Sequence, residues 1–161
     1  MFTRRDVPGP AIEQVEPNLR LIRIDAGPPE PVDKEAQIAY LPELIRNMEP
    51  YLAGESPGYD VLHSHYWQSG RAGLVLARQF HLPHVTMFHT LGEVRNRARI
   101  SEREPRLRIF HERRIARGVD AIVTASEHER VLLERHYGAP QSRMVTIPCG
   151  VDLARFHPHD Q

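Results

Sequence analysis

The sequence predicts an α/β fold, a three-layer Rossmann-like domain with a mostly parallel sheet, and three observations predict it. Short β-type runs alternate with helical patterns along most of the chain. The connections between them are short, as in a parallel sheet with helices on both faces. The chain has 161 residues, which is enough for one hydrophobic core of ordinary size and not for two.

The first half of the chain predicts two strands and two helices. Residues 19–25 have β-type composition and precede a proline-rich loop. Pro42 lies inside the helical stretch that follows and is expected to kink it. Residues 59–63 form a strand-like run, and a helix is expected from about residue 71 to residue 80. The first helix is predicted from apolar residues at helical spacing, namely Ile38, Leu41, Leu44, Ile45 and Met48.

The middle of the chain predicts a strand followed by a helix. Residues 84–88 are strand-like. Pro105 suits the first turn of a helix, where its missing N–H is not needed. The buried side of this helix is expected to hold Leu107, Phe110 and Ile115.

A capped helix is expected between the last two strands. Residues 121–125 form an apolar strand. Ser126 and Glu129 have the spacing of a capping box, and Gly138 suits the end of the helix that follows. Residues 144–147 form the last strand. Strands that alternate with helices in this way are typical of a parallel sheet.

Composition and charge exclude several classes of protein. Lysine plus arginine equals aspartate plus glutamate, 21 each, so neither nucleic acid nor an anionic membrane is expected as the main partner. Cys149 is the only cysteine, which excludes an intramolecular disulfide and a thiolate metal cluster. The sequence has no apolar run for a membrane span and no secretory signal at its start. A cytoplasmic location is therefore expected.

Polar side chains follow four of the predicted strands. They lie at residues 63–67, at His89 and Thr90, at Ser126 and Glu127, and at residues 148–150. In open parallel sheets, ligands bind outside the carboxyl ends of the strands. The functional site is therefore expected at this edge of the sheet.

Several of these residues allow more than one interpretation. The alternate spacing of His63 and His65 could seat a metal, but the sequence nearby offers no further ligand at suitable spacing. We therefore expect one of these histidines to pack under the strand end and the other to face the cleft. Cys149 could be a nucleophile, although a lone cysteine is more often a small packing residue.

An arginine-rich stretch has two interpretations that the sequence leaves open. It could be a solvated surface, or it could capture a phosphate group, for which the planar guanidinium is suited. Its members are Arg95, Arg97, Arg99, Arg103, Arg106, Arg108, Arg113 and Arg114.

Three motifs together resemble family 4 glycosyltransferases. They are DVLHSHYW at residues 60–67, FHTLG at 88–92, and PCGVD at 148–152 with RFHP at 155–158. The first two are most similar to the branch that holds sucrose-phosphate synthase and the N-acetylglucosaminyltransferase that acts on inositol phosphate in the mycothiol pathway. The resemblance implies a GT-B fold, in which two Rossmann-like domains face each other across a cleft.

The resemblance also implies a division of the chain. Residues 1–148 resemble the N-terminal, acceptor-side domain without its first strand and glycine loop, and residues 149–161 resemble the start of the interdomain linker. The C-terminal, donor-binding domain would be the partner of this one. The implied reaction moves a hexose or N-acetylhexosamine from a nucleoside-diphosphate sugar to a phosphorylated polyol or sugar. It retains anomeric configuration, needs no cofactor or metal, and is not expected of this stretch alone.

The resemblance assigns roles to five residues. Lys34, Tyr66, Thr90 and Arg108 resemble residues that bind the acceptor phosphate. His89 resembles the catalytic histidine beside the transferred sugar. Two alternatives stay open, namely a non-catalytic module that binds a phosphorylated ligand or a partner chain, and a hydrolase built on Cys149 and a histidine.

Overall fold

A computed structural model describes residues 1–55, 58–98 and 103–156. The strands in this part of the chain are β1 Phe2–Arg4, β2 Ile12–Glu16, β3 Leu19–Ile24, β4 Leu62–His65, β5 His84–Met87, β6 Ala121–Thr124 and β7 Met144–Thr146. The α-helices are α1 Leu41–Ala53, α2 Tyr66–Phe80, α3 Gly92–Ala98, α4 Arg106–Gly118 and α5 Glu127–Tyr137. Short 3₁₀ turns precede α1 at Ala36–Tyr40 and β7 at Gln141–Arg143.

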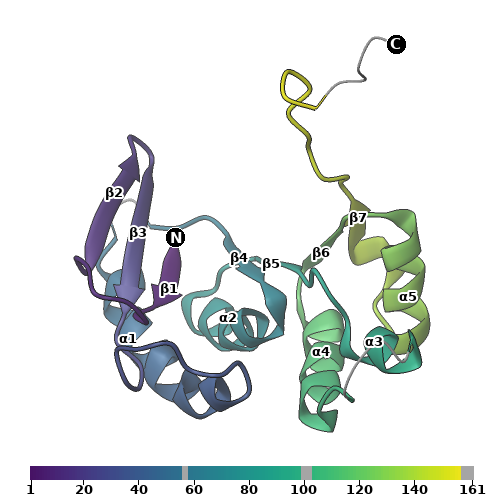
Figure 1. The fold of residues 1–161 in the computed structure, drawn as a ribbon, viewed down its shortest axis with the longest axis horizontal. Coiled ribbons are helices and arrows are strands. Elements are labelled where there is room, and N and C mark those ends of the chain that lie inside the picture. Colours follow the sequence, from purple (N-terminus) through teal and green to yellow (C-terminus); the bar gives the residue numbers. More distant parts are fainter. Residues whose placement is uncertain (56–57, 99–102, 157–161) are drawn as a thin grey trace.

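A four-stranded parallel sheet carries the predicted site edge (Figure 1). Its strand order is β4-β5-β6-β7, and all three pairings are parallel. Because consecutive strands are neighbours, right-handed crossovers place α2, α4 and α5 on one face. The α/β class and the mostly parallel sheet are confirmed. All four carboxyl ends lie at one edge of this sheet.

The core lies between this sheet and its helices. Its largest members are Trp67 at the start of α2, Phe88 after β5 and Tyr137 at the end of α5. Phe88 and Tyr137 are both fully buried. The core therefore reaches up to the carboxyl edge of the sheet, where residues that follow the strands are anchored in it.

A second sheet is separate from the first. It has the order β1-β3-β2, with β1 parallel and β2 antiparallel to β3. An 860 Å³ groove lies between the two sheets and is lined by β1, β4, α1 and α2, with Phe2, Leu44, Leu62 and Leu76 among its apolar residues. The sheet in the described residues is thus interrupted between β1 and β4.

The helix ends follow local sequence chemistry. Ser126 caps α5 by accepting the Glu129 N–H at 3.2 Å, and the Glu129 carboxylate accepts the Ala125 N–H at 2.8 Å. Gly138 ends α5 in the left-handed region, at φ 67°. Pro42 lies in the first turn of α1, where proline is tolerated, so the expected kink there is wrong.

Other boundaries also differ from the expectations. The short strands β1 and β2 are not anticipated by the sequence, and β2 is exposed along its length. β4 ends at His65, so residues 63–65 lie within the strand and not after it. The helix expected from residue 71 begins at Tyr66, because a positive φ of 72° at Tyr66 turns the chain directly out of the strand.

The buried side of α4 was assigned wrongly at two positions. Leu107 and Phe110 are about half exposed, whereas Ile115 is buried as expected. Arg108 and Glu112 take the inward positions instead, with 3% and 0% exposure. An ion pair inside the core thus displaces the apolar pattern from which this face was predicted.

Candidate functional site

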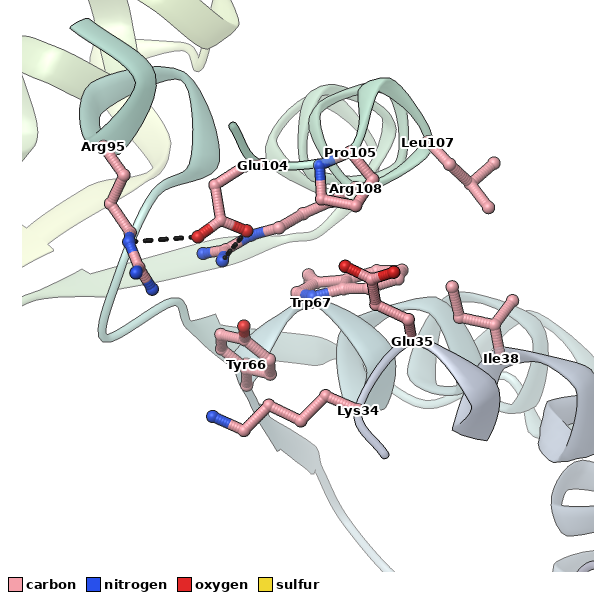
Figure 2. Close-up of a pocket in the computed structure, with 10 residues that line it drawn as sticks. All are labelled: Lys34, Glu35, Ile38, Tyr66, Trp67, Arg95, Glu104, Pro105, Leu107 and Arg108. Atoms are coloured by element: carbon pink, nitrogen blue, oxygen red, sulfur yellow. Dashed lines mark hydrogen bonds and ion pairs between the residues drawn. The ribbon is translucent and has the colours of Figure 1, made fainter. Parts of the chain in front are cut away.

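A pocket of about 340 Å³ opens beside the carboxyl ends of β4 and β5 (Figure 2). Its charged and aromatic lining comes from the loop before α1, the start of α2, α3 and the start of α4. These residues are Lys34, Glu35, Tyr66, Trp67, Arg95, Arg108 and Glu104, of which Glu104 lies two residues before α4. The pocket therefore gathers side chains from four segments that are distant in sequence.

Tyr66 is the central aromatic of this pocket. The Arg108 guanidinium carbon is 5.0 Å from its ring centroid, and the Lys34 Nζ is 6.0 Å away. Both distances are those of cation–π contacts. The positive φ of Tyr66 is uncommon for an aromatic residue and projects this ring from the strand–helix junction. The ring therefore lies between two cations at the mouth of the pocket (Figure 2).

Lys34 is held at the pocket through its backbone. The side-chain amide of the buried Gln68 donates to the Lys34 carbonyl oxygen. Gln68 lies in the first turn of α2, close to Tyr66. The ammonium group of Lys34 stays exposed and available to a ligand.

Arg108 is the most buried cation of the pocket. Its Nη2 donates to the carbonyl oxygen and to the hydroxyl oxygen of Thr90, both at 3.0 Å. Its Nη1 donates to Glu104 at 2.8 Å, and its Nε donates to Glu112 at 2.7 Å. Arg108 therefore links the chain after β5 to α4 and orients Thr90 at the sheet edge.

A buried network behind the pocket fixes Arg108. The Glu112 carboxylate also accepts the backbone N–H of Gly92 at 3.0 and 3.1 Å and the Tyr137 hydroxyl at 2.7 Å. Burial raises the pKa of Glu112, against the opposing effects of Arg108, Tyr137 and the Gly92 N–H. Burial also raises the pKa of the Tyr137 phenol. The network joins α3, α4 and α5 behind the pocket.

Glu104 lies between two arginines at the front of the pocket. Its Oε1 is 3.0 Å from Arg95 Nε, and its Oε2 is 2.8 Å from Arg108 Nη1. Both contacts are drawn in Figure 2. The side chain of Glu104 is only 13% exposed. A carboxylate of the protein itself thus bridges two of the cations that line the pocket.

His89 lies outside this pocket and pairs with His65. The Nδ1 of His65 and the Nε2 of His89 are 2.8 Å apart, and the two rings stack at 5.1 Å. Burial, followed by the charges of His63 and His89, lowers the pKa of His65. His89 has a positive φ of 63°, which presents its exposed side chain directly after β5. Such backbone strain is often found at functional sites.

The structure brings four of the sequence-proposed residues together. Lys34, Tyr66 and Arg108 line one pocket, and Thr90 is hydrogen-bonded to Arg108. The histidine at position 89 stands next to Thr90, on the side of the His65 ring. These contacts gather one aromatic ring, one hydroxyl group and two cations at the carboxyl edge of the sheet.

The interpretation of the neighbouring histidines is corrected. His63 and His65 are both exposed, and their rings lie 4.4 Å apart on the same face of β4. Alternate residues of a strand share a face, so neither packs under the strand end. No group of three or more His, Cys, Asp or Glu side chains in the described ranges could hold a metal ion.

The arginine-rich stretch divides between the pocket and the surface. Arg95 and Arg108 line the pocket. Arg97 and Arg113 form ion pairs with Glu93 at 3.1 and 3.8 Å. Arg99 lies outside the described residues. The stretch thus contains both pocket-lining members and members that pair at the surface.

Sequence reasoning missed the acidic residues of the site. Glu104, Arg108 and Glu112 stand four residues apart, the spacing at which charged side chains meet along a helix. That spacing is the one signal in the sequence that could have indicated these ion pairs.

Two further features bear on the alternatives. Cys149 is exposed, and none of the hydrogen bonds among the described residues joins it to a histidine. Among the helices that the structure describes, each is too short or too polar to cross a membrane.

Comparison with known proteins identifies the family. The sequence model of the family described as Glycosyltransferase Family 4 matches residues 1–155. The D-inositol 3-phosphate glycosyltransferase of Pseudarthrobacter chlorophenolicus is 36% identical over 162 residues, which cover 98% of this chain and 39% of that protein. The enzyme of the same name from Streptomyces bingchenggensis is 36% identical over 155 residues, covering 94% of this chain and 34% of that protein.

A solved structure shows the same architecture. Sucrose-phosphate synthase from Thermosynechococcus elongatus superimposes with a TM-score of 0.88 at 31% identity, covering 99% of this chain and 40% of that one. The chain thus spans about two fifths or less of the length of these three relatives. From its motifs, its sheet and these matches, the chain belongs to glycosyltransferase family 4.

Proposed function

We propose that residues 1–148 form the acceptor side of a retaining GT-B glycosyltransferase and that the pocket around Tyr66 binds the phosphate of a phosphorylated acceptor. One observation carries the proposal: Lys34, Arg95 and Arg108 converge on a single pocket at the carboxyl edge of the sheet. Arginine donates two parallel hydrogen bonds to a phosphate, and lysine adds a mobile charge. The relatives whose names specify an inositol phosphate or a sucrose phosphate support this choice of ligand.

The geometry suggests how the pocket would position an acceptor. The phosphate would lie near Tyr66 and Thr90, with its negative charge opposite Lys34. The acceptor hydroxyl would then extend toward His89, which stands beside Thr90 on the exposed side of the sheet edge. His89 would act on the sugar side of the cleft, and the leaving diphosphate of the donor would serve as the base. The protein would thus act by positioning the reactants and by stabilising charge.

The donor half of the reaction would come from a C-terminal domain. Residues 149–161 would begin the linker to this domain. The C-terminal domain would bind a nucleoside-diphosphate hexose or N-acetylhexosamine. A non-catalytic module for phosphorylated ligands would use the same pocket. The two functions differ in turnover, which requires the donor domain.

Calorimetric titration with inorganic phosphate and with inositol phosphate tests the pocket. Lys34→Ala should weaken phosphate binding about fivefold to tenfold, because one charge-assisted contact to the ligand is lost. The substitution leaves no buried group without its hydrogen-bond partner, so no further cost is expected. Arg106→Ala is the matched control, since Arg106 is exposed on α4 and does not line the pocket. Equal binding by the parent chain and Lys34→Ala would remove this pocket as the phosphate site.

A further inference from the structure

The position of Glu104 carries an inference that rests on the proposed function and deepens it. Its two carboxylate oxygens contact Arg95 Nε at 3.0 Å and Arg108 Nη1 at 2.8 Å. Figure 2 shows the carboxylate directed at both guanidinium groups from the pocket wall. The donors that would hold a phosphate are therefore already bonded to an anion of the chain itself.

The backbone of Glu104 is fixed at this place. The Asn96 Oδ1 accepts the Glu104 N–H at 2.7 Å, and the Asn96 Nδ2 lies 3.4 Å from the Glu104 carbonyl oxygen. Pro105 follows and keeps residue 104 out of the helical region, so α4 begins only at Arg106. The carboxylate is thus presented between α3 and α4 by a backbone that Asn96 holds from both sides.

The donors of Arg108 show what the carboxylate occupies. A guanidinium has five N–H donors. Nε is taken by Glu112, and Nη2 is taken by the carbonyl and hydroxyl oxygens of Thr90. The Nη1 group, which faces the pocket, donates to Glu104. These bonds use four of the five N–H groups and leave one N–H of Nη1. A phosphate that takes two hydrogen bonds from Arg108 must therefore displace a partner, and Glu104 is the partner that lines the pocket.

The charges of the pocket support this competition. Three cations, Lys34, Arg95 and Arg108, line it. Glu35 and Glu104 line it as well, and Glu112 neutralises Arg108 from behind. Three positive and three negative groups leave no net charge for a phosphate dianion. Displacing one carboxylate from the arginines restores the positive field that the ligand needs.

We propose that Glu104 is a specificity-determining residue that holds the guanidinium donors of the phosphate position and is displaced from them by the ligand's phosphate. A dianion that bonds both arginines can outcompete a single carboxylate, whereas a weaker anion cannot. Glu104 thereby selects phosphorylated ligands over carboxylates. The alternative is a purely structural role, in which Glu104 keeps Arg108 in place and its removal weakens phosphate binding.

The two roles of Glu104 predict opposite signs for one substitution. We expect Glu104→Gln to bind inorganic phosphate about tenfold more tightly than the parent chain, because the amide is a weaker competitor for the guanidinium donors. Its amide oxygen can still accept from one arginine, which preserves the local fold. Glu35→Gln is the matched control, since it removes the same charge from the pocket without touching either arginine, and it should strengthen binding much less.

Calorimetry of the four proteins, namely the parent chain, Glu104→Gln, Glu35→Gln and Lys34→Ala, separates the outcomes. Phosphate binding that is weakened by Lys34→Ala but not strengthened by Glu104→Gln beyond Glu35→Gln overturns the role of Glu104 and leaves the pocket standing. Binding that Lys34→Ala does not weaken overturns the pocket and this role together. If Glu104→Gln does not fold, Glu104→Asp replaces it, because the shorter carboxylate cannot bridge both arginines and should also raise affinity.

A second readout follows the arginines directly. Titration with phosphate should shift the NMR signals of the Arg95 Nε–H and of the Arg108 Nη1–H groups in the parent chain, because these are the donors that contact Glu104. In Glu104→Gln the chemical shifts of these signals before titration should be closer to those of guanidinium groups exposed to water. They should also respond at lower phosphate concentration. Titration with acetate should move them in Glu104→Gln more than in the parent chain. Equal responses of both proteins to acetate would contradict the proposed selection.

Discussion

The Nε of Arg108 donates to the carboxylate of Glu112 at 2.7 Å, in an ion pair whose side chains are 3% and 0% exposed. The same guanidinium reaches Thr90 with its other end. One side chain thus belongs both to the core and to the proposed phosphate site. The stability of the domain and the geometry of the site are therefore expected to change together when this pair is altered.

Removing the buried carboxylate should destabilise the chain strongly. We expect Glu112→Ala to lower the free energy of unfolding by about 3–5 kcal/mol, because it leaves a buried guanidinium without its partner. Glu127 provides the control, since it pairs with Arg130 at the surface and is 66% exposed. Urea unfolding of both variants measures the difference. A Glu112→Ala variant as stable as Glu127→Ala would show that the network contributes little.

Stability should fall at mildly acidic pH because of His84. Burial lowers the pKa of His84 from 6.5 to about 4, with Asp120 acting against this shift and His63 adding to it. The folded state therefore binds fewer protons than the unfolded state between these values. Stability is lost as pH falls from about 6.5 to about 4, by about 3 kcal/mol for this group.

The hydrogen bonds of His84 explain why its protonation is costly. Ser64 donates to Thr86 and so must accept from the Nε2 of His84, at 2.8 Å. The Nδ1 atom is buried without a hydrogen-bond partner among the described residues. A proton there would place an unpaired charge in the core. His84→Gln should flatten the pH dependence of urea unfolding, and the exposed His128→Gln should leave it as in the parent chain.

A methyl group at position 73 should disturb the same histidine. A Cβ on Gly73 would lie 2.5 Å from His84 Nε2 and 3.0 Å from a methyl carbon of Leu62. His84 is 2% exposed and bonded to Ser64, so it has little room to move. Overpacking costs about 1–3 kcal/mol, against a gain of about 1 kcal/mol from better helix propensity. We therefore expect Gly73→Ala to melt at a lower temperature than the parent chain.

The control for this substitution is Gly58→Ala. A Cβ at position 58 would meet no atom within 4 Å. Its melting temperature should stay close to that of the parent chain. If Gly73→Ala melts at or above the temperature of Gly58→Ala, the packing around His84 is looser than the structure indicates.

The alternation of strands and helices could be predicted because it depends on local patterns. The capped helix α5 shows this best, since Ser126, Glu129 and Gly138 act within their own segment. The pairing of β1 with β3 could not be predicted in the same way. It depends on contacts between Phe2 and Ile22 that are distant in sequence, and β1 has only three residues.

The site could be predicted in its cations and not in its anions. The resemblance to the family indicated Lys34, Tyr66, Thr90 and Arg108 as phosphate-binding candidates. The carboxylates of Glu104 and Glu112 were missed because both are largely buried through their contacts with Arg108, whereas a charged residue in or beside a helix is normally interpreted as exposed. Burial of a charge depends on a partner, and the fold decides which partner lies within reach.

The last prediction concerns turnover. We expect the 161-residue polypeptide, expressed by itself, to bind phosphate and yet to show no measurable glycosyl transfer. Catalysis depends on holding donor and acceptor in reactive geometry, and the rate advantage is lost when one of them is not held. The chain spans 39% of the Pseudarthrobacter relative, and the proposed donor side would lie in the remainder.

Assays should combine labelled nucleotide sugars with inositol phosphate and sugar phosphates. They should be run with the chain alone and with the separately expressed C-terminal part of that relative. Transfer that appears only on addition of the second domain is the expected result. Transfer by the chain alone would mean that residues 1–161 also bind the donor, and it would contradict the assignment of this domain to the acceptor.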